Sequence, residues 1–228
     1  NRNRMKKAVF SWSGGKDSAY AFHELGDEIE VVELLTTVSE NGRSSMHGVR
    51  TELIQRQADK MGIPINFVEI PDEVSNDEYE DRMRRTLENY AGKGIETVVF
   101  ADIHLEDVRE YRENNLADLP LEGYWNIWGR DTTNLIDNFL DAGFRATTVC
   151  VNSQLGEEFV GRELDADLLD DLPDAVDPCG ENGEFHTFVW DAPFYDEPID
   201  VETGEVVERE LGGGDSDVFY YCDLVHRP

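Results

Sequence analysis

The segment at residues 13–18, with the sequence SGGKDS, carries the side chains best suited to chemistry. Two glycines, two serines, a lysine and an aspartate stand between a strand-like run at residues 8–12 and a helix-like pattern that follows. A tight turn that leads into a helix leaves the first backbone N–H groups of that helix without partners. Those donors and the positive end of the helix dipole together bind phosphate groups. The segment therefore predicts a phosphate-binding turn.

Each side chain of this turn can contribute to binding an anion. Gly14 and Gly15 allow the backbone to approach a phosphate closely and to adopt conformations that other residues disfavour. Lys16, in a chain with few lysines, supplies a positive charge. Asp17 either caps the helix or holds a metal ion through water, and it is the metal-binding residue that we expect. The predicted cofactor-binding residues of this segment are Ser11, Trp12, Ser13, Gly14, Gly15, Lys16, Asp17 and Ser18, of which residues 13–18 would hold the phosphates.

Strand-like and helix-like runs alternate through the first half of the chain. The strand-like runs, which are almost continuously apolar, cover residues 8–12, 29–38, 65–70 and 97–103. Apolar residues at helical spacing follow the first run and recur in residues 50–61, and further helices are expected at residues 77–90 and, with a charged composition, at residues 106–115. This alternation predicts a parallel sheet covered by helices on both faces, which is a Rossmann-like α/β fold.

The second half of the chain mixes helix-like and strand-like patterns. Helices are expected at residues 132–142 and 165–172, and strands at residues 145–151, 183–190, 201–211 and 217–226, the last two antiparallel. A stretch rich in Leu, Pro and Gly at residues 116–131 is the candidate boundary. We expect a domain carrying the phosphate turn at residues 5–118 and a smaller mixed α/β domain, which binds the substrate, at residues 119–228. Residues 1–4 precede Met5 and are expected to be a cloning remnant.

The formal net charge of −30, from 50 acidic and 20 basic residues, is the strongest compositional feature. A solvated acidic surface suits a protein kept soluble in very high salt, so we expect halophilic adaptation, with a basic partner as the alternative. The charge argues against a nucleic-acid partner, although molar salt screens much of the repulsion. Cys150, Cys179 and Cys222 lie far apart, which is typical of free thiols in a reducing cytosol. No apolar run approaches the ~18 residues of a membrane span, and we expect a cytoplasmic protein.

The phosphate-binding segment and a second motif carry a resemblance to a known family. SGGKDS after the first strand resembles the PP-loop of the ATP-pyrophosphatase superfamily, whose members have a HUP-type Rossmann-like domain. DPCGENGEFHTFVWDAPFY, residues 177–195, resembles the second signature of the diphthine–ammonia ligase family. The similarity runs from Met5 to about Phe194. It includes residues 48–64, 100–113, 127–131 and 140–152.

The resemblance implies an enzyme that splits ATP between its α- and β-phosphates, with Mg²⁺ as the metal ion. A carboxylate would be adenylated with release of pyrophosphate, and ammonia would then displace AMP to form an amide. In the family this is the last step of diphthamide formation on elongation factor 2. The expected partners are therefore ATP, ammonium, and either elongation factor 2 or a small-molecule carboxylate. The acidic composition points to a haloarchaeal source, and the sequence leaves a homodimer open.

Residues beyond the turn are expected at the same site. Thr36 and Thr37 end the second strand and Asp102 ends the fourth, so they lie at the carboxyl edge where α/β sheets bind ligands, and they would border the adenosine. His47 and Arg50 follow the second strand and are expected to contact the nucleotide or the substrate.

The catalytic residues implied by the resemblance are Lys16, Glu181, Glu184 and His186. Glu181 and Glu184 would orient ammonia or hold a cationic group of the substrate. Solvated surface positions are the alternative for them, because the chain has 50 acidic residues. His186 either faces the site or packs within its strand.

One departure from the family pattern concerns the substrate. The family's ligases carry Glu where this chain has His186, so the sequence GENGEFHT indicates a divergent subgroup. The alternatives are a PP-loop adenylating enzyme that acts on another small carboxylate or amide, and a non-enzymatic ATP-binding protein. A tRNA-thiolating enzyme is disfavoured because the chain has neither cysteine pairs nor a basic surface for RNA.

Overall fold

The computed structural model of the chain describes residues 4–71, 73–210 and 218–228. Its first sheet contains five parallel strands in the order β3-β2-β1-β4-β5. These strands are β1 (Lys6–Ser11), β2 (Ile29–Val38), β3 (Ile65–Glu69), β4 (Thr97–Val99) and β5 (Glu122–Tyr124). The first four overlap the predicted runs, and their parallel order confirms the Rossmann-like α/β fold.

Helices cover both faces of this sheet. Successive side chains of a strand point to opposite faces, so neighbouring residues of β1 show which helices pack on each face. Ala8 and Phe10 of β1 belong to an apolar cluster that includes residues of α1 and α2. Val9 belongs to a second cluster, with residues of α3 and α4. The helices are α1 (Lys16–His23), α2 (Thr51–Met61), α3 (Asn76–Gly92) and α4 (Glu106–Leu116). None of the helices in the described residues is long and apolar enough to cross a membrane.

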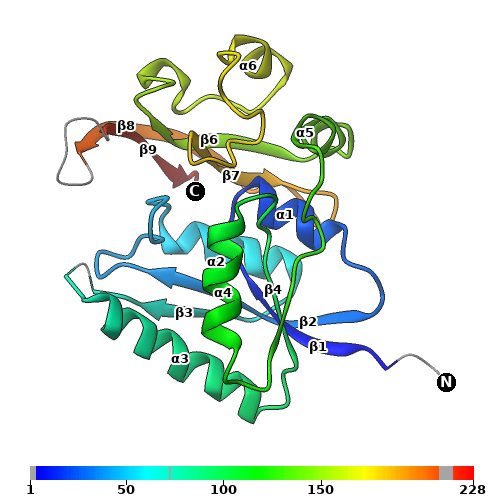
Figure 1. Cartoon of the computed structure of the whole chain (residues 1–228). Helices are drawn as coiled ribbons and strands as arrows, with labels where there is room; N and C mark the ends of the chain where they lie inside the picture. Colours follow the sequence, from blue (N-terminus) through cyan, green and yellow to red (C-terminus); the bar gives the residue numbers. More distant parts are fainter. Residues whose placement is uncertain (1–3, 72, 211–217) are drawn as a thin grey trace.

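The second half forms an antiparallel sheet in the order β7-β6-β9-β8, which confirms a smaller mixed α/β region. Figure 1 shows α1 and α2 between the two sheets and α3 on the other side of the parallel sheet, where Leu116 of α4 belongs to the same apolar cluster as Leu87 of α3. The phosphate turn therefore lies where the two sheets face each other. The elements are β6 (Arg145–Asn152), β7 (Phe185–Asp191), β8 (Val201–Glu210), β9 (Val218–His226), α5 (Thr132–Asp141), α6 (Ala166–Asp171) and the short 3₁₀ helix η1 (Glu157–Phe159).

The structure between the two halves differs from the one predicted from the sequence. β4 is shorter than expected, since it ends at Val99, and β5 pairs with it inside the stretch predicted as a domain boundary. The three residues of β5 are too few to show a strand period. The parallel sheet thus extends to Tyr124, and one apolar cluster includes both Phe10 of the first sheet and Phe188 of the second. The two halves share a core, and the division at residue 118 stays a prediction.

A charged contact joins the loop after β2 to β9. The carboxylate of Asp223 accepts hydrogen bonds from Nε and Nη2 of Arg50, at 3.0 and 2.8 Å, and from Nη1 of Arg43 at 3.0 Å. The bonds from Arg50 and then Arg43 lower the pKa of Asp223. Only 18% of the Asp223 side chain is exposed, so solvent screens the contact incompletely. The loop is thereby held against the second sheet.

We expect Asp223→Asn to lower the free energy of unfolding by about 1–2 kcal/mol, because two guanidinium groups lose their anionic partner. Urea unfolding at a fixed salt concentration measures the change. Asp200→Asn is the matched control, since Asp200 is exposed and lies 3.8 Å from Arg227. The control should lose less than about 0.5 kcal/mol. Equal losses in the two variants would contradict the structural role of the Asp223 contact.

Candidate nucleotide-binding site

The turn between β1 and α1 presents unpaired backbone donors. β1 ends at Ser11 and α1 begins at Lys16, so Asp17 and Ser18 occupy the first turn of the helix. No group in the described part of the chain accepts a hydrogen bond from the backbone N–H of Asp17 or Ser18. The positive end of the helix dipole lies at the same point. These donors can therefore bind an anion without breaking a bond within the chain.

Hydrogen bonds to its two serine hydroxyls and the backbone conformation of Gly14 fix the conformation of the turn. The backbone N–H groups of Ser13 and Gly15 donate to Ser18 Oγ and Ser13 Oγ, both at 3.2 Å, and the two hydroxyl oxygens lie 2.9 Å apart. Gly14 has a φ of +81°, in the left-handed region that favours glycine. A Cβ at Gly14 would lie 2.7 Å from Oε1 of Gln57. Only glycine fits at this position.

Lys16 is buried beneath the second motif. Its Nζ lies 3.3 Å from Oδ1 of Asp17 and 5.0 Å from the ring centre of Phe185, and its side chain is 4% exposed. Burial alone would lower the pKa of Lys16, but the negative charges of Asp17 and Glu181 contribute to an opposing effect that outweighs it, so the pKa is raised. Lys16 is therefore a fixed positive charge at the entrance to α1.

Asp17 is paired with its neighbour Lys16. Its Oδ1 is buried, and the polar contact that it makes among the described residues is the ion pair with Nζ of Lys16 at 3.3 Å. Burial raises the pKa of Asp17 against the effect of Lys16, and Asp177 and Asp102 add to the rise. A carboxylate oxygen of this kind, beside a phosphate turn, suits a hydrated divalent cation. The described residues contain no group of three or more His, Cys, Asp and Glu that could hold a metal ion, so such an ion would need ligands from phosphate and water.

The second motif forms a turn before β7 that is braced by its own carboxylates. Glu184 is buried and accepts hydrogen bonds from the backbone of Asp177 at 3.3 Å and of Asn182 at 3.1 Å. Glu181 reaches out of the turn instead, and its Oε1 accepts from the backbone N–H groups of Ile103 at 2.9 Å and His104 at 3.3 Å. Burial, and then the charge of Asp17, raises the pKa of Glu181. Glu184 thus shapes the turn, and Glu181 lies near Lys16 and Asp17.

His47 and His186 are brought together from distant parts of the sequence. Their rings stack with centroids 4.0 Å apart and planes 23° from parallel. Met46, directly before His47, has a φ of +67°, a conformation that costs a non-glycine residue about 1–2 kcal/mol. Burial lowers the pKa of both imidazoles, to about 4 for His47, and the charge of Lys16 contributes to both shifts. The pair therefore forms a neutral aromatic surface near Lys16.

Most of the remaining predicted site residues use their polar groups in contacts within the chain. Trp12 is buried and donates through Nε1 to Gln57 at 3.0 Å, and Thr36 is buried and donates to Trp12 O at 2.6 Å. Asp102 accepts from Nε of Arg112 at 2.7 Å and from the indole of Trp125 at 3.0 Å. Their polar groups already have partners within the chain. Arg50 is likewise paired with Asp223, whereas Ser11 and Thr37 are partly exposed at the strand ends.

Two residues that connect the motifs were not predicted as site residues. Thr187 follows His186 on β7, and its Oγ1 accepts a hydrogen bond from the backbone N–H of Lys16 at 3.0 Å. Gln57 on α2 donates through Nε2 to Gly14 O and to Val189 O, both at 2.9 Å. The sequence feature that could have identified Gln57 is its position as a polar residue on the apolar face of a predicted helix. Thr187 lies within the second motif but has no distinctive spacing.

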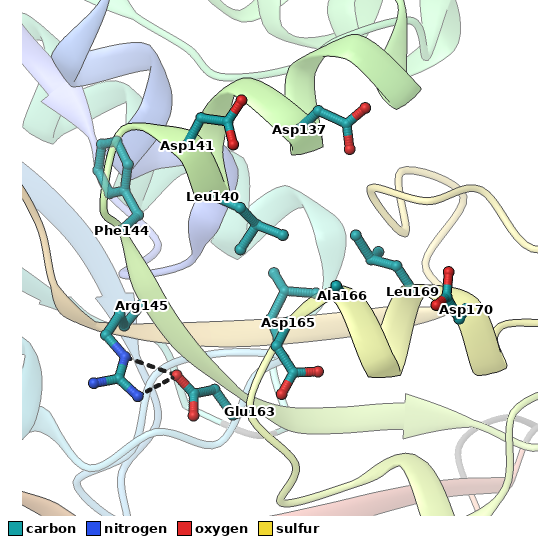
Figure 2. Close-up of a pocket in the computed structure, with 11 residues that line it drawn as sticks. Asp137, Leu140, Asp141, Phe144, Arg145, Glu163, Asp165, Ala166, Leu169 and Asp170 are labelled. Carbon is teal, nitrogen blue, oxygen red and sulfur yellow. Dashed lines mark hydrogen bonds and ion pairs between the residues drawn. The ribbon is translucent and has the colours of Figure 1, made fainter.

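A surface hollow of about 590 Å³ lies elsewhere, between α5, β6 and α6 (Figure 2). Arg145 is the one basic residue in its lining, and it is paired with Glu163, with Nη2 2.7 Å from the carboxylate. The other charged residues of the lining are acidic: Asp137, Asp141, Asp165 and Asp170. No predicted site residue lines this hollow, and its charge is unsuited to a phosphate.

A parallel sheet of this order, with unpaired backbone amides at the turn after β1, is typical of nucleotide-binding α/β proteins. Two models of one family match the chain along most of its length. The model described as the diphthamide synthase N-terminal domain matches residues 5–117, and the one described as the diphthamide synthase C-terminal domain matches residues 131–213. The chain belongs to the diphthamide synthase family.

Two curated relatives are both named diphthine–ammonia ligase. The protein of Schizosaccharomyces pombe is 28% identical, over 88% of this chain and 37% of the yeast protein. The protein of Danio rerio is 26% identical, over 86% of this chain and 86% of the fish protein. The chain thus spans little more than a third of the yeast relative.

We expect both imidazoles of the stacked pair to stay neutral as the pH falls from about 7 to about 5. Because the pKa values of His47 and His186 are lowered by folding, the stability that neutral rings confer is complete above about pH 6.5. It is lost progressively as the pH falls through about 4, the folded pKa of His47. ¹⁵N shifts of the ring nitrogens report protonation, and His47→Gln and His186→Gln assign the signals. Titration of either ring near pH 6.5 would contradict the stacked geometry.

Proposed function

We propose that the chain is an ATP-dependent ligase that forms an amide from a carboxylate and ammonia, with AMP and pyrophosphate as the other products. The observation that carries the proposal is the contact between the PP-loop and the second motif. Lys16 lies over Phe185, and its backbone N–H donates to Thr187. The two family models and the names of the relatives support the same reaction.

The first step would be adenylation. A carboxylate oxygen of the substrate attacks the α-phosphorus of ATP, the bond from that phosphorus to the bridging oxygen breaks, and pyrophosphate leaves. Lys16 and the free N–H groups of Asp17 and Ser18 would stabilise the negative charge on the departing phosphates. The carboxylate of Asp17, at the start of α1 beside the turn, fits a hydrated Mg²⁺. When bound there, the ion would neutralise phosphate charge.

The second step would be attack by ammonia on the acyl carbon, with release of AMP and one proton. Glu181 is the group that we assign to ammonium, since Oε1 is held by the backbone of Ile103 and His104 and no described residue donates to Oε2. A carboxylate with a raised pKa is a better proton acceptor near neutral pH. Glu184 would act as a positioning residue, because its oxygens are used within the turn.

The proposed substrate is the diphthine side chain of elongation factor 2. The relatives' names supply the substrate class, and the diphthine carboxylate would approach between the second-motif turn and the histidine pair. A second candidate is adenylation of another carboxylate or amide. The specific observation behind it is that His186 stacks on His47 as a neutral ring, at a position where the family resemblance implies a carboxylate.

We expect the chain, incubated in molar KCl with ATP, Mg²⁺, ammonium and diphthine-bearing elongation factor 2, to release AMP and pyrophosphate in equal amounts. Chromatography of the nucleotides and mass spectrometry of the factor measure the products. The product amide should be absent when ammonium is left out. ADP and phosphate as the only nucleotide products would contradict the proposal. AMP formed only with other carboxylates would favour the second candidate.

We expect Lys16→Met to reduce ATP affinity at least tenfold, about 1.4 kcal/mol, because the charge is lost while the apolar stem still packs on Phe185. Calorimetric titration with ATP and Mg²⁺ in molar KCl measures the affinity. Lys7→Ala is the control, since Lys7 is exposed on β1 away from the turn. Unchanged ATP affinity in Lys16→Met would show that the buried lysine does not bind the phosphates.

A further inference from the structure

Gln57 is a fully buried polar side chain on the apolar face of α2. A carboxamide buried without partners costs about 1–3 kcal/mol, so its groups must be satisfied. Its Oε1 accepts from Nε1 of Trp12 at 3.0 Å, and its Nε2 donates to Gly14 O and Val189 O, both at 2.9 Å. Both of its donor hydrogens and its acceptor are thus used, and the side chain joins the end of β1, the phosphate turn and β7.

The carbonyl of Gly14 receives two donors from this arrangement. Besides Nε2 of Gln57, the backbone N–H of Val189 donates to it at 3.0 Å. In a trans peptide the C=O and the following N–H point in opposite directions. With the Gly14 oxygen held inward, the N–H of Gly15 points outward, where it donates to Ser13 Oγ at 3.2 Å.

A reversed peptide would disable the anion site. If the Gly14–Gly15 peptide turned over, a carbonyl oxygen with partial negative charge would face the phosphates, and the bond from Gly15 to Ser13 would be lost. Glycine at position 14 has few steric barriers to such a turn. The turn therefore needs an external constraint, and the described donors that supply it are Gln57 and Val189.

We propose that Gln57 is a positioning residue for phosphate binding: its carboxamide holds the Gly14 carbonyl inward and fixes the turn to β7, the strand that carries His186. The inference rests on the proposed function in taking ATP as the ligand. Gln57 itself touches no phosphate, because its three hydrogen bonds are made within the core. Its loss should weaken binding of the phosphates and leave binding of the nucleoside unchanged.

The test compares affinities for ATP and for adenosine in the full chain, measured by calorimetry in molar KCl with Mg²⁺. Gln57→Met keeps the length of the side chain and removes all three hydrogen bonds. We expect ATP affinity to fall at least tenfold and adenosine affinity to change less than threefold. Gln55→Met is the matched control, since Gln55 is exposed on the same helix and its side chain, among the described residues, bonds to Asp59 alone. Both affinities of this variant should match those of the parent chain.

A second variant, Gln57→Glu, keeps the test decisive if the methionine variant does not fold. A buried glutamate without a cation partner is protonated, so it retains the acceptor for Trp12 and one donor. We expect its loss of ATP affinity to lie between those of the parent and of Gln57→Met. Equal losses for ATP and adenosine, no loss for ATP, or failure of both variants to fold would overturn the inference, because Gln57 would then serve stability alone.

The outcomes separate this inference from the proposed reaction. A parent chain that binds no ATP would overturn both. A parent chain that binds ATP but forms no AMP with any carboxylate would overturn only the reaction, and the ratio of ATP to adenosine affinities in the Gln57 variants would still decide the role of Gln57.

Discussion

The pair of hydrogen bonds to the Gly14 carbonyl, from Gln57 and from Val189, is the contact on which the site depends. A phosphate site made of backbone amides works only if the carbonyl oxygens of the same turn face away from the anion. Here the second sheet, and not the turn alone, supplies that constraint. The arrangement explains why a glycine is required at position 14, where a Cβ would meet the Gln57 oxygen at 2.7 Å. The shared core has a role in the same arrangement. β7 can hold the Gly14 carbonyl in place only if β7 itself is packed firmly against the first half of the chain.

The proposed phosphate site contains a buried positive charge, whereas the chain as a whole is strongly negative. In a protein with a net charge of −30, the positive side chain at the proposed phosphate site is the buried Lys16, which lies beside unpaired amides and the positive end of a helix dipole. Burial protects these contacts from screening, which matters in concentrated salt. Burial raises the pKa of Asp17 and Glu181, and the negative charges of these two carboxylates in turn help to keep the buried Lys16 protonated. The stacked histidines near Lys16 add no charge, since their pKa values are lowered.

The parts that could be predicted from the sequence are those encoded locally. Continuous apolar strands and helical spacing predicted the parallel sheet, and SGGKDS predicted the position of the turn, because both depend on neighbouring residues. The stack of His47 on His186 could not be predicted, since it joins residues far apart in the chain through the packing of two sheets. The same holds for Gln57, whose partners lie on three segments. The partners of Glu184 are near it in the sequence, but the motif does not indicate that the turn directs this side chain inward. β5 was missed because a three-residue strand has no detectable period.

The central claim is that the first bend of the chain binds a triphosphate through its free amides. A crystal structure with Mg²⁺ and an ATP analogue that cannot be cleaved between the α- and β-phosphates tests it most directly. The account predicts phosphate oxygens within about 3.2 Å of the backbone nitrogens of Asp17 and Ser18, with the Gly14 carbonyl still directed at Gln57. A nucleotide bound with its phosphates away from this turn, or a Gly14 carbonyl facing the phosphates, would contradict it.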